Sequence, residues 1–304
     1  MSAATVTRMA SGDRAPDYTD DLRLAHVLAD DADSLTGHRF KALDLHVARK
    51  PDLTPVTDAD RAVEEGIRRT LSRARPRDAV TGEEHGTTGS GSRRWIVDPI
   101  DGTKNFVRGV PVWATLIALA VDDEVVVGVV SAPQLNRRWW ASKGGGAWTG
   151  RSLLRATACR VSDVDDLADA SFSYSSLTGW EQAGQLQDFL ALSRRCWRTR
   201  AYGDFWSYML VAEGAVDIAA EPELETYDMA ALDVIVREAG GTFTSLAGTP
   251  GPWGGNAVAT NGRLHDQALS YLGAVPDGDD PDVVRPEQGV LHDLSARRRR
   301  SEDQ

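Results

Sequence analysis

Cysteine and histidine are scarce in this 304-residue sequence, and neither is arranged as a metal-binding motif. The two cysteines, Cys159 and Cys196, lie far apart, which excludes a CxxC site and a framework of disulfides. The six histidines form no HxH or HExxH pair. A metal bound by this chain should therefore be a hard ion held by oxygen ligands.

Long apolar runs are also missing. No segment approaches the roughly 20 apolar residues of a membrane span, and the first residues lack the apolar core of a signal peptide. Together with the isolated cysteines, this predicts a cytoplasmic protein without a membrane partner. The formal net charge of -11 opposes binding to nucleic acid, so we expect no nucleic-acid partner either.

With 41% hydrophobic and 26% charged residues, the composition is that of a globular protein of about two domains or subdomains. The four arginines at 297–300 are interpreted as part of a solvated tail, because Glu302 and Asp303 follow them; a binding patch is the alternative. We expect mobile tails at 1–20 and 275–304, an N-terminal subdomain over 21–150 that ends at a glycine-rich stretch, and a C-terminal subdomain over 151–274.

Hydrophobic spacing predicts a mixed α/β chain. Val63, Ile67 and Leu71 recur every fourth residue, and Thr57 with Asp60 resembles a capping box that starts this helix. A short apolar run at 95–97 is typical of a buried strand that ends at Asp98-Pro99. The other predicted elements are helices at 21–35, 206–214 and 228–239 and strands at 115–121, 124–131, 138–142 and 216–219.

The stretch from Asp98 to Thr103 carries the clearest chemical signal. Asp98 and Asp101 stand three positions apart on the turn that leaves the strand, where two carboxylates would repel each other without a cation between them. Gly102 and Thr103 can present backbone amides and a hydroxyl to an anion. Simple closure of a turn is the alternative. A covalent aspartyl-phosphate is disfavoured, because the DxD motif of such phosphatases spaces its acids two apart.

Acidic residues in three other segments could point into the same cleft. They are Glu83 with Glu84 just before the strand, Asp58 at the start of one helix and Asp228 at the start of another. The helix-terminal acids could instead cap their helices, and the glutamate pair could lie in a solvated loop. Spacing alone does not bring these residues together.

Taken in their order along the sequence, these motifs resemble those of the inositol monophosphatase family of magnesium-dependent phosphatases. The resemblance covers about residues 21–273 and rests on Thr57-Asp58, Gly82-Glu83-Glu84, Trp95 to Phe106, and Tyr227-Asp228 running into Glu238 to Gly241. Within the family, the chain is more similar to the histidinol-phosphatases of actinobacteria, through Lys50 to Asp58, Arg138 to Trp140 and Ala201 to Phe205.

The resemblance implies a layered αβαβα sandwich, two or three Mg²⁺ ions per subunit, and a homodimer. Asp58 and Thr103 would orient and deprotonate the attacking water, and with Glu83 they are the expected catalytic residues. No phospho-enzyme is expected. The metal ligands would be Glu83, Asp98, the carbonyl of Ile100, Asp101 and Asp228.

The same resemblance predicts the substrate and the residues that bind it. Relatives that bind inositol commonly have a small hydroxyl residue where this chain has Asp204, and an added carboxylate favours a ligand with positive charge. L-Histidinol phosphate, with its amine and imidazole, is therefore the expected substrate, and histidine synthesis the expected pathway. The alternatives are myo-inositol 1-phosphate or another small sugar phosphate, a capping role for Asp204, and a metal-dependent regulatory protein without turnover. The expected substrate-binding residues are Asp101, Gly102, Thr103, Gly203, Asp204, Glu221 and Asp228.

Overall fold

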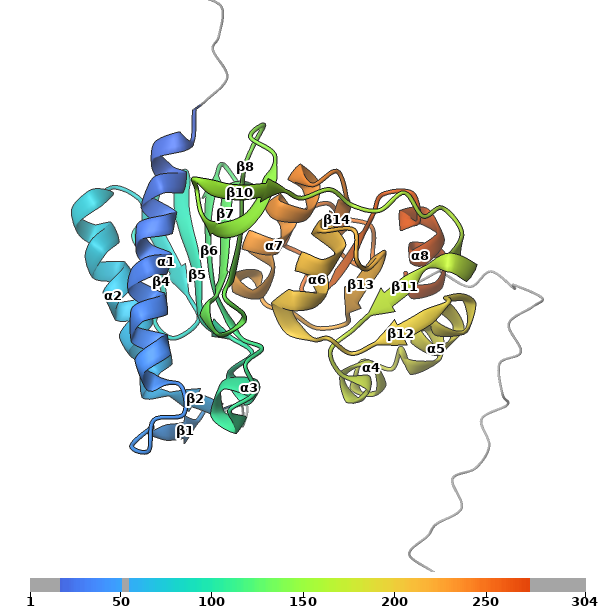
Figure 1. The fold of residues 1–304 in the computed structure, drawn as a ribbon, viewed down its shortest axis with the longest axis horizontal. Coiled ribbons are helices and arrows are strands. Elements are labelled where there is room, and N and C mark those ends of the chain that lie inside the picture. The colour runs from blue at the N-terminus through green and yellow to red at the C-terminus, as the bar shows by residue number, and fades with distance from the viewer. Residues whose placement is uncertain (1–16, 51–54, 274–304) are drawn as a thin grey trace, which may run out of the picture. The chain divides into compact units, whose positions relative to one another are not determined.

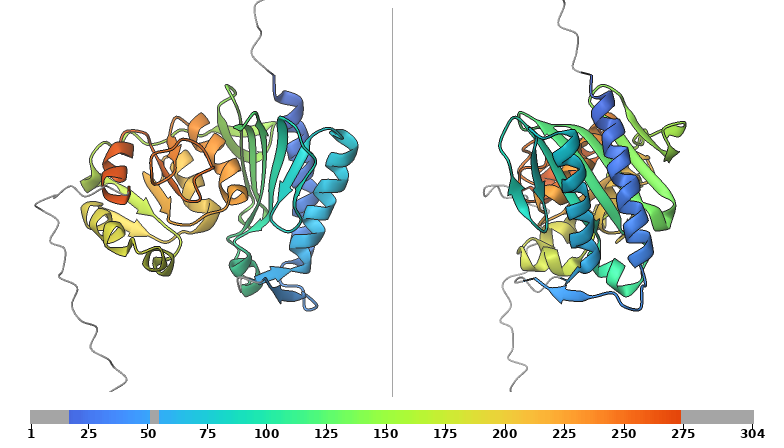
Figure 2. Two further views of the ribbon diagram at one scale, coloured as in Figure 1. Left: turned by 180° about the vertical axis from the view of Figure 1, so that it is seen from behind. Right: turned by 90° about the vertical axis from the view of Figure 1, so that its left-hand side faces the viewer.

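Helices and sheets alternate in five layers in the computed structural model, which describes residues 17–50 and 55–273 (Figures 1 and 2). Nearly all of the two expected tails, including the arginines at 297–300, falls outside these residues. No helix within the described ranges combines the length and the apolar character needed to cross a bilayer.

Two long helices, α1 (Thr19–Arg39) and α2 (Asp58–Ala74), form the first layer. The start of α2 is the predicted one, because Thr57 accepts hydrogen bonds from the first turn and the Asp60 carboxylate accepts one from the Thr57 amide at 2.8 Å. The predicted stripe of Val63, Ile67 and Leu71 is buried against the neighbouring sheet. Burial of an apolar face, more than helix propensity, therefore holds α2 in place.

The second layer is an eight-stranded sheet in which β3 and β5 run parallel and the other neighbours antiparallel. Its central strands are buried on both faces, which explains their nearly continuous apolar sequence. In spatial order the strands are β10 (Arg155–Ala158), β9 (Ala147–Ser152), β8 (Arg137–Ser142), β7 (Glu124–Ala132), β6 (Ala114–Val121), β5 (Arg93–Asp101), β3 (Ala79–Gly82) and β4 (Gly86–Thr88).

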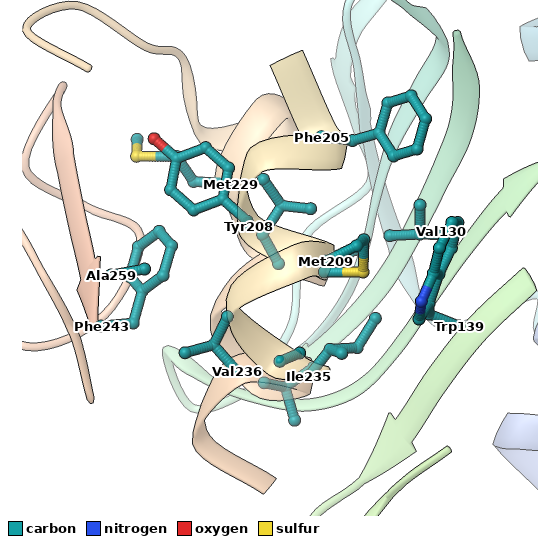
Figure 3. Packing of buried hydrophobic residues seen from close by; sticks show 14 of the residues in the cluster. Val130, Trp139, Phe205, Tyr208, Met209, Met229, Ile235, Val236, Phe243 and Ala259 are labelled. Atoms are coloured by element: carbon teal, nitrogen blue, oxygen red, sulfur yellow. The ribbon is translucent and has the colours of Figure 1, made fainter. Parts of the chain in front are cut away.

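The third layer consists of α6 (Asp204–Ala212) and α7 (Thr226–Glu238), which lie between the two sheets. Figure 3 shows Met209 of α6 facing Val130 and Trp139 of the large sheet, while Tyr208 points to the opposite side, toward Phe243. Because α6 is buried on both sides, the residues at its first turn are held firmly.

A five-stranded sheet and three short helices complete the layers. The helices are α4 (Leu177–Gln182), α5 (Leu186–Arg195) and α8 (His265–Leu272). In spatial order the strands are β12 (Arg198–Arg200), β11 (Ser171–Ser173), β13 (Ile218–Glu221), β15 (Ala257–Thr260) and β14 (Thr242–Thr244). This arrangement is the predicted αβαβα sandwich.

The remaining elements lie in connections. A two-stranded sheet, β1 (Val47–Arg49) and β2 (Pro55–Thr57), precedes α2, and the short helix α3 (Thr103–Arg108) follows β5. Two 3₁₀ turns occur at Pro133–Leu135 and Leu167–Asp169.

Among the boundaries that differ from those predicted, two concern the layout of the sheets. The strand expected to end at residue 97 continues to Asp101, because an irregularity after Asp98 lets the chain pair again with Ala114. Residue 150 lies inside β9, and β9 and β10 both extend the first sheet. The chain enters the second sheet only at Ser171, so the glycine-rich stretch is a turn and the change of sheet comes after β10.

Candidate metal centre and active site

Asp98 and Asp101 are fixed by the irregular end of β5. The Asp98 carboxylate accepts a hydrogen bond from the Ile100 amide at 3.0 Å, and the Thr115 hydroxyl donates to the Pro99 carbonyl at 2.8 Å. Gly102 follows with a φ of +82°, and a Cβ there would lie 3.1 Å from the Val112 carbonyl oxygen. Glycine is thus required both for the left-handed turn and for the close approach of the connection that precedes β6.

A first cluster consists of Asp98, Asp101 and Asp228. One carboxylate oxygen from each lies within 4.8 Å of the others. Asp228 reaches this point from the first turn of α7, where it also accepts a hydrogen bond from the Glu225 amide at 2.8 Å. Burial, reinforced by the neighbouring acidic charges, raises the pKa of Asp98 and Asp101 well above the ordinary range and that of Asp228 to about 7.

A second cluster consists of Asp60, Glu83 and Glu84, again with one oxygen from each within 4.8 Å of the others. The Lys50 ammonium lies 2.6 Å from Glu83 Oε1 and 2.7 Å from Glu84 Oε1. Burial and the charges of the two glutamates raise the pKa of Asp60 to about 6. Glu83 also raises the pKa of Asp98 and Asp228, so the two clusters adjoin through its carboxylate.

These clusters suit divalent cations with oxygen ligands. Buried carboxylates at such distances destabilise one another unless a proton or a cation lies between them. Glu83 Oε2 is buried and has no hydrogen-bond partner among the described residues, which leaves an acceptor available to a metal. Carboxylates together with the Ile100 carbonyl form the type of donor set that Mg²⁺ prefers. Metal binding therefore fits the residues present.

The structure corrects the expectation for Asp58. Its side chain is 43% exposed and pairs with Arg39, with 2.7 Å between Nη2 and Oδ2. Asp60 instead approaches Thr103, whose hydroxyl lies 3.4 Å from Asp60 Oδ1 and donates to the Ile100 carbonyl at 2.9 Å. The capping box explains the difference, since a residue at the third helical position turns its carboxylate back toward the helix start. The Thr57-x-x-Asp60 spacing was the signal for Asp60, although sequence reasoning used it only for the cap.

The expected substrate residues converge beside the first cluster. Gly203 has a φ of +82° and Asp204 one of +49°, and this turn brings the Phe205 amide to Asp101 Oδ2 at 2.7 Å. The Asp204 carboxylate accepts a hydrogen bond from the side-chain Nδ2 of Asn105 at 3.1 Å and makes no capping bond to α6. Asn105 was not identified from the sequence, although it lies in the same motif as Asp101.

Glu221, at the end of β13, faces the same region. Burial and the charge of Asp204 raise its pKa to about 8, and its Oε1 has no hydrogen-bond partner in the described part of the chain. The fully buried Tyr208 lies close enough for Glu221 to raise the pKa of its hydroxyl. Two carboxylates, Asp204 and Glu221, thus stand next to Asp101 of the candidate metal centre.

Comparisons with known proteins show the family to which this site belongs. The sequence profile of the inositol monophosphatase family matches residues 22–276. The chain belongs to the inositol monophosphatase family. This chain is 67% identical over 261 residues to the histidinol-phosphatase of Streptomyces coelicolor, covering 84% of this chain and 98% of that protein. It is 62% identical over 257 residues to the histidinol-phosphatase of Mycobacterium tuberculosis, with 84% and 98% covered.

The structure of this inositol monophosphatase family member is similar to solved ones. An inositol monophosphatase from Zymomonas mobilis superposes with a TM-score of 0.75 at 32% identity, covering 84% of this chain and 99% of that one. The family is metal-dependent, and the two acidic clusters are the groups in the described residues that fit this dependence.

The raised pKa values predict how the pH changes the stability of metal-free protein. A carboxyl group whose pKa is higher in the folded than in the unfolded state stabilises the fold at low pH, and this contribution is lost as the pH rises through the folded pKa. For Asp60, Asp228 and Glu221 the folded pKa values are about 6, 7 and 8. We expect the melting temperature of chelator-treated protein to fall between pH 4.5 and 8.5, by about 2–4 °C per kcal/mol lost.

Differential scanning fluorimetry across this pH range checks the expectation. Added Mg²⁺ should restore the melting temperature most strongly at the high-pH end, because it replaces the protons. If the melting temperature of the metal-free protein rose between pH 4.5 and 8.5, these carboxylates could not be repelling one another as we infer.

Proposed function

We propose that this protein is a Mg²⁺-dependent phosphoric monoester hydrolase that converts L-histidinol phosphate to L-histidinol and phosphate in histidine synthesis. The observation that carries the proposal is the 67% identity, over nearly the whole related protein, to a histidinol-phosphatase. The acidic substrate side of the site, formed by Asp204 and Glu221, supports it independently.

The proposed metal ligands are Glu83, Asp98, Asp101, Asp228 and the Ile100 carbonyl, for two or three ions. When bound, Mg²⁺ would neutralise the phosphate and lower the pKa of water at the site. Asp60 is the proposed general base: its pKa of about 6 leaves it mostly ionised at neutral pH yet still able to accept a proton. The Thr103 hydroxyl, between Asp60 and the Ile100 carbonyl, would orient the attacking water.

The positions of the chain's own groups indicate how the phosphate would be bound and from which side water would attack it. The backbone amides of Thr103 and of the residue after it would donate hydrogen bonds to phosphate oxygens, as turns of this kind do. The water would attack from the Asp60 side, and the leaving alcohol would depart toward Asp204 and Glu221. Because hydrolysis needs no covalent intermediate in this arrangement, no phospho-enzyme is proposed.

Asp204 and Glu221 are the proposed specificity residues. In the absence of a ligand, burial and the charge of Asp204 raise the pKa of Glu221 to about 8, and burial raises the pKa of Asp204 against the opposing charge of Lys104. The amine and imidazole of histidinol could pair with both carboxylates, whereas a neutral polyol would bring no positive charge to Glu221 and would leave Asp204 with the charge of Lys104 alone. The site therefore favours a cationic leaving group over inositol.

Replacing Asp204 by asparagine tests the charge argument. Asparagine tolerates the observed φ of +49° and keeps the size of the side chain, whereas a β-branched residue would be strained there. We expect the KM for L-histidinol phosphate to rise about tenfold or more, since a hydrogen bond to a charged group contributes about 1.5–3 kcal/mol. The KM for myo-inositol 1-phosphate should not rise; an unchanged KM for L-histidinol phosphate would contradict the argument.

Phosphate release tests the function as a whole. Purified protein with Mg²⁺ should release phosphate from L-histidinol phosphate in strong preference to myo-inositol 1-phosphate, and a chelator should abolish the release. Preference for the inositol ester would keep the metal centre and replace the substrate. No release from either would favour a regulatory role.

Two further parts of the proposal rest on the resemblance and on composition. We propose a homodimer, which light scattering after size-exclusion chromatography would test. A cytoplasmic location is proposed because the two cysteines are unpaired, Cys159 being buried and Cys196 partly buried.

A further inference from the structure

Glu64 is a buried carboxylate that belongs to neither acidic cluster. It lies one turn after Asp60 on α2, and its carboxylate is fully buried. Its Oε2 accepts a hydrogen bond from the Glu84 amide at 2.7 Å, and its Oε1 accepts one from the His85 amide at 3.2 Å. The carboxylate therefore binds the backbone of the turn that carries two of the acids of the second cluster.

The sequence of this turn leaves room for Glu64. A Cβ on Gly82 would lie only 2.3 Å from Cδ and Oε1 of Glu64, closer than any real contact. Gly82 is therefore needed for space, because the Glu64 carboxylate occupies the place of its missing side chain. The Glu83 amide is held separately, by the Val97 carbonyl at 3.3 Å.

Arg68, one turn further along α2, binds both Glu64 and β4. Its Nε donates to Glu64 Oε1 at 2.7 Å, its Nη1 donates to the Thr88 hydroxyl at 2.8 Å, and its Nη2 donates to the Gly86 carbonyl. Asp60, Glu64 and Arg68 are spaced four residues apart and so lie on one face of the helix. This face contacts the whole connection from β3 to β4.

We propose that Glu64 is a positioning residue that sets the cation affinity of the metal centre, because it holds the turn that carries the proposed ligand Glu83 and its neighbour Glu84; this inference rests on the proposed metal dependence. Asp60 is placed by α2 directly, whereas Glu83 and Glu84 are placed by the turn that Glu64 holds. Their separation from Asp60 thus depends on the Glu64 contacts. Partners of metal ligands typically change metal affinity about 10–100-fold when they are altered.

Replacing Glu64 by glutamine tests the proposal. Glutamine keeps the shape of the side chain, but its amide nitrogen cannot accept a hydrogen bond, so either the Glu84 or the His85 amide loses its acceptor. Mn²⁺ titrated into chelator-treated protein by calorimetry should bind about 10–100-fold more weakly. The Mg²⁺ concentration for half-maximal phosphate release should rise in parallel, while kcat at saturating Mg²⁺ should change much less.

Glu65→Gln is the matched control. Its side chain is 56% exposed, and its Oε1 lies 3.8 Å from His85 Nε2, so the same change of charge should leave both the calorimetric and the kinetic affinities unchanged. A second variant, Gly82→Ala, keeps the Glu64 charge and displaces its carboxylate by adding a methyl group. It should weaken Mn²⁺ binding in the same way. If Glu64→Gln does not fold, Gly82→Ala alone tests the positioning role of Glu64.

The possible results separate this inference from the proposed function. Normal Mn²⁺ affinity in folded Glu64→Gln or Gly82→Ala protein, with normal binding by the unmodified protein, would overturn the positioning role alone. A fall in kcat without a change in affinity would also overturn it. If the unmodified protein bound no cation, the proposed metal-dependent function would fail, and this inference with it.

Discussion

Asparagine at position 60 is expected to lower kcat for phosphate release by about 10²–10⁴-fold, the usual contribution of a general base. Asp60 is the acid that meets Thr103, and its pKa of about 6 suits proton transfer near neutral pH. Asparagine has nearly the same shape, and its carbonyl oxygen can still accept the hydrogen bond from the Thr57 amide, so α2 should keep its cap. Steady-state kinetics at saturating Mg²⁺ measure the loss.

The matched control is Asp58→Asn, two residues earlier. That carboxylate pairs with Arg39 at the surface, an interaction that contributes about 0–1 kcal/mol. The kcat of this variant should stay near that of the unmodified protein. If Asp58→Asn lost activity and Asp60→Asn did not, the structural assignment would be wrong and the sequence-based one right.

Asp101→Asn is expected to have opposite effects on activity and on metal-free stability. Asp101 belongs to the first cluster and faces Asp204 and Glu221 as well, and burial together with these charges raises its pKa well above the ordinary range. Loss of one ligand should weaken cation binding by at least the roughly 10–100-fold that loss of an outer partner produces. Activity at limiting Mg²⁺ should therefore nearly vanish.

The same variant should melt at a higher temperature than the unmodified protein when both are treated with a chelator at pH 8. Removing one of several buried like charges relieves repulsion, and an asparagine oxygen can still accept the hydrogen bond from the Phe205 amide. Calorimetric Mn²⁺ binding and thermal melting of the two proteins measure both effects. Unchanged Mn²⁺ affinity would exclude Asp101 as a ligand, and a lower melting temperature would contradict the electrostatic explanation.

Local pattern was sufficient for the long elements and for part of the site: it predicted α1, α2, α6 and α7 and the central strands of the large sheet, but not α3, α4, α5 and α8. The capping box at Thr57, the stripe from Val63 to Leu71 and the acids at 98 and 101 are recognisable because helix period and turn chemistry act over a few residues. Family resemblance added the layered order of the elements, which no local pattern contains.

The tertiary structure decided which acids meet. Asp58 and Asp60 are two positions apart on one helix, and only the packing of α2 against β3, β5 and α3 shows that the first faces Arg39 and the second Thr103. The same packing buries Glu64 against the Gly82 turn, whereas the packing of α7 against β5 brings Asp228, far along the chain, to Asp98. Sequence determines which side chains can bind a cation, but their convergence depends on contacts between distant segments, which periodicity along one segment does not record.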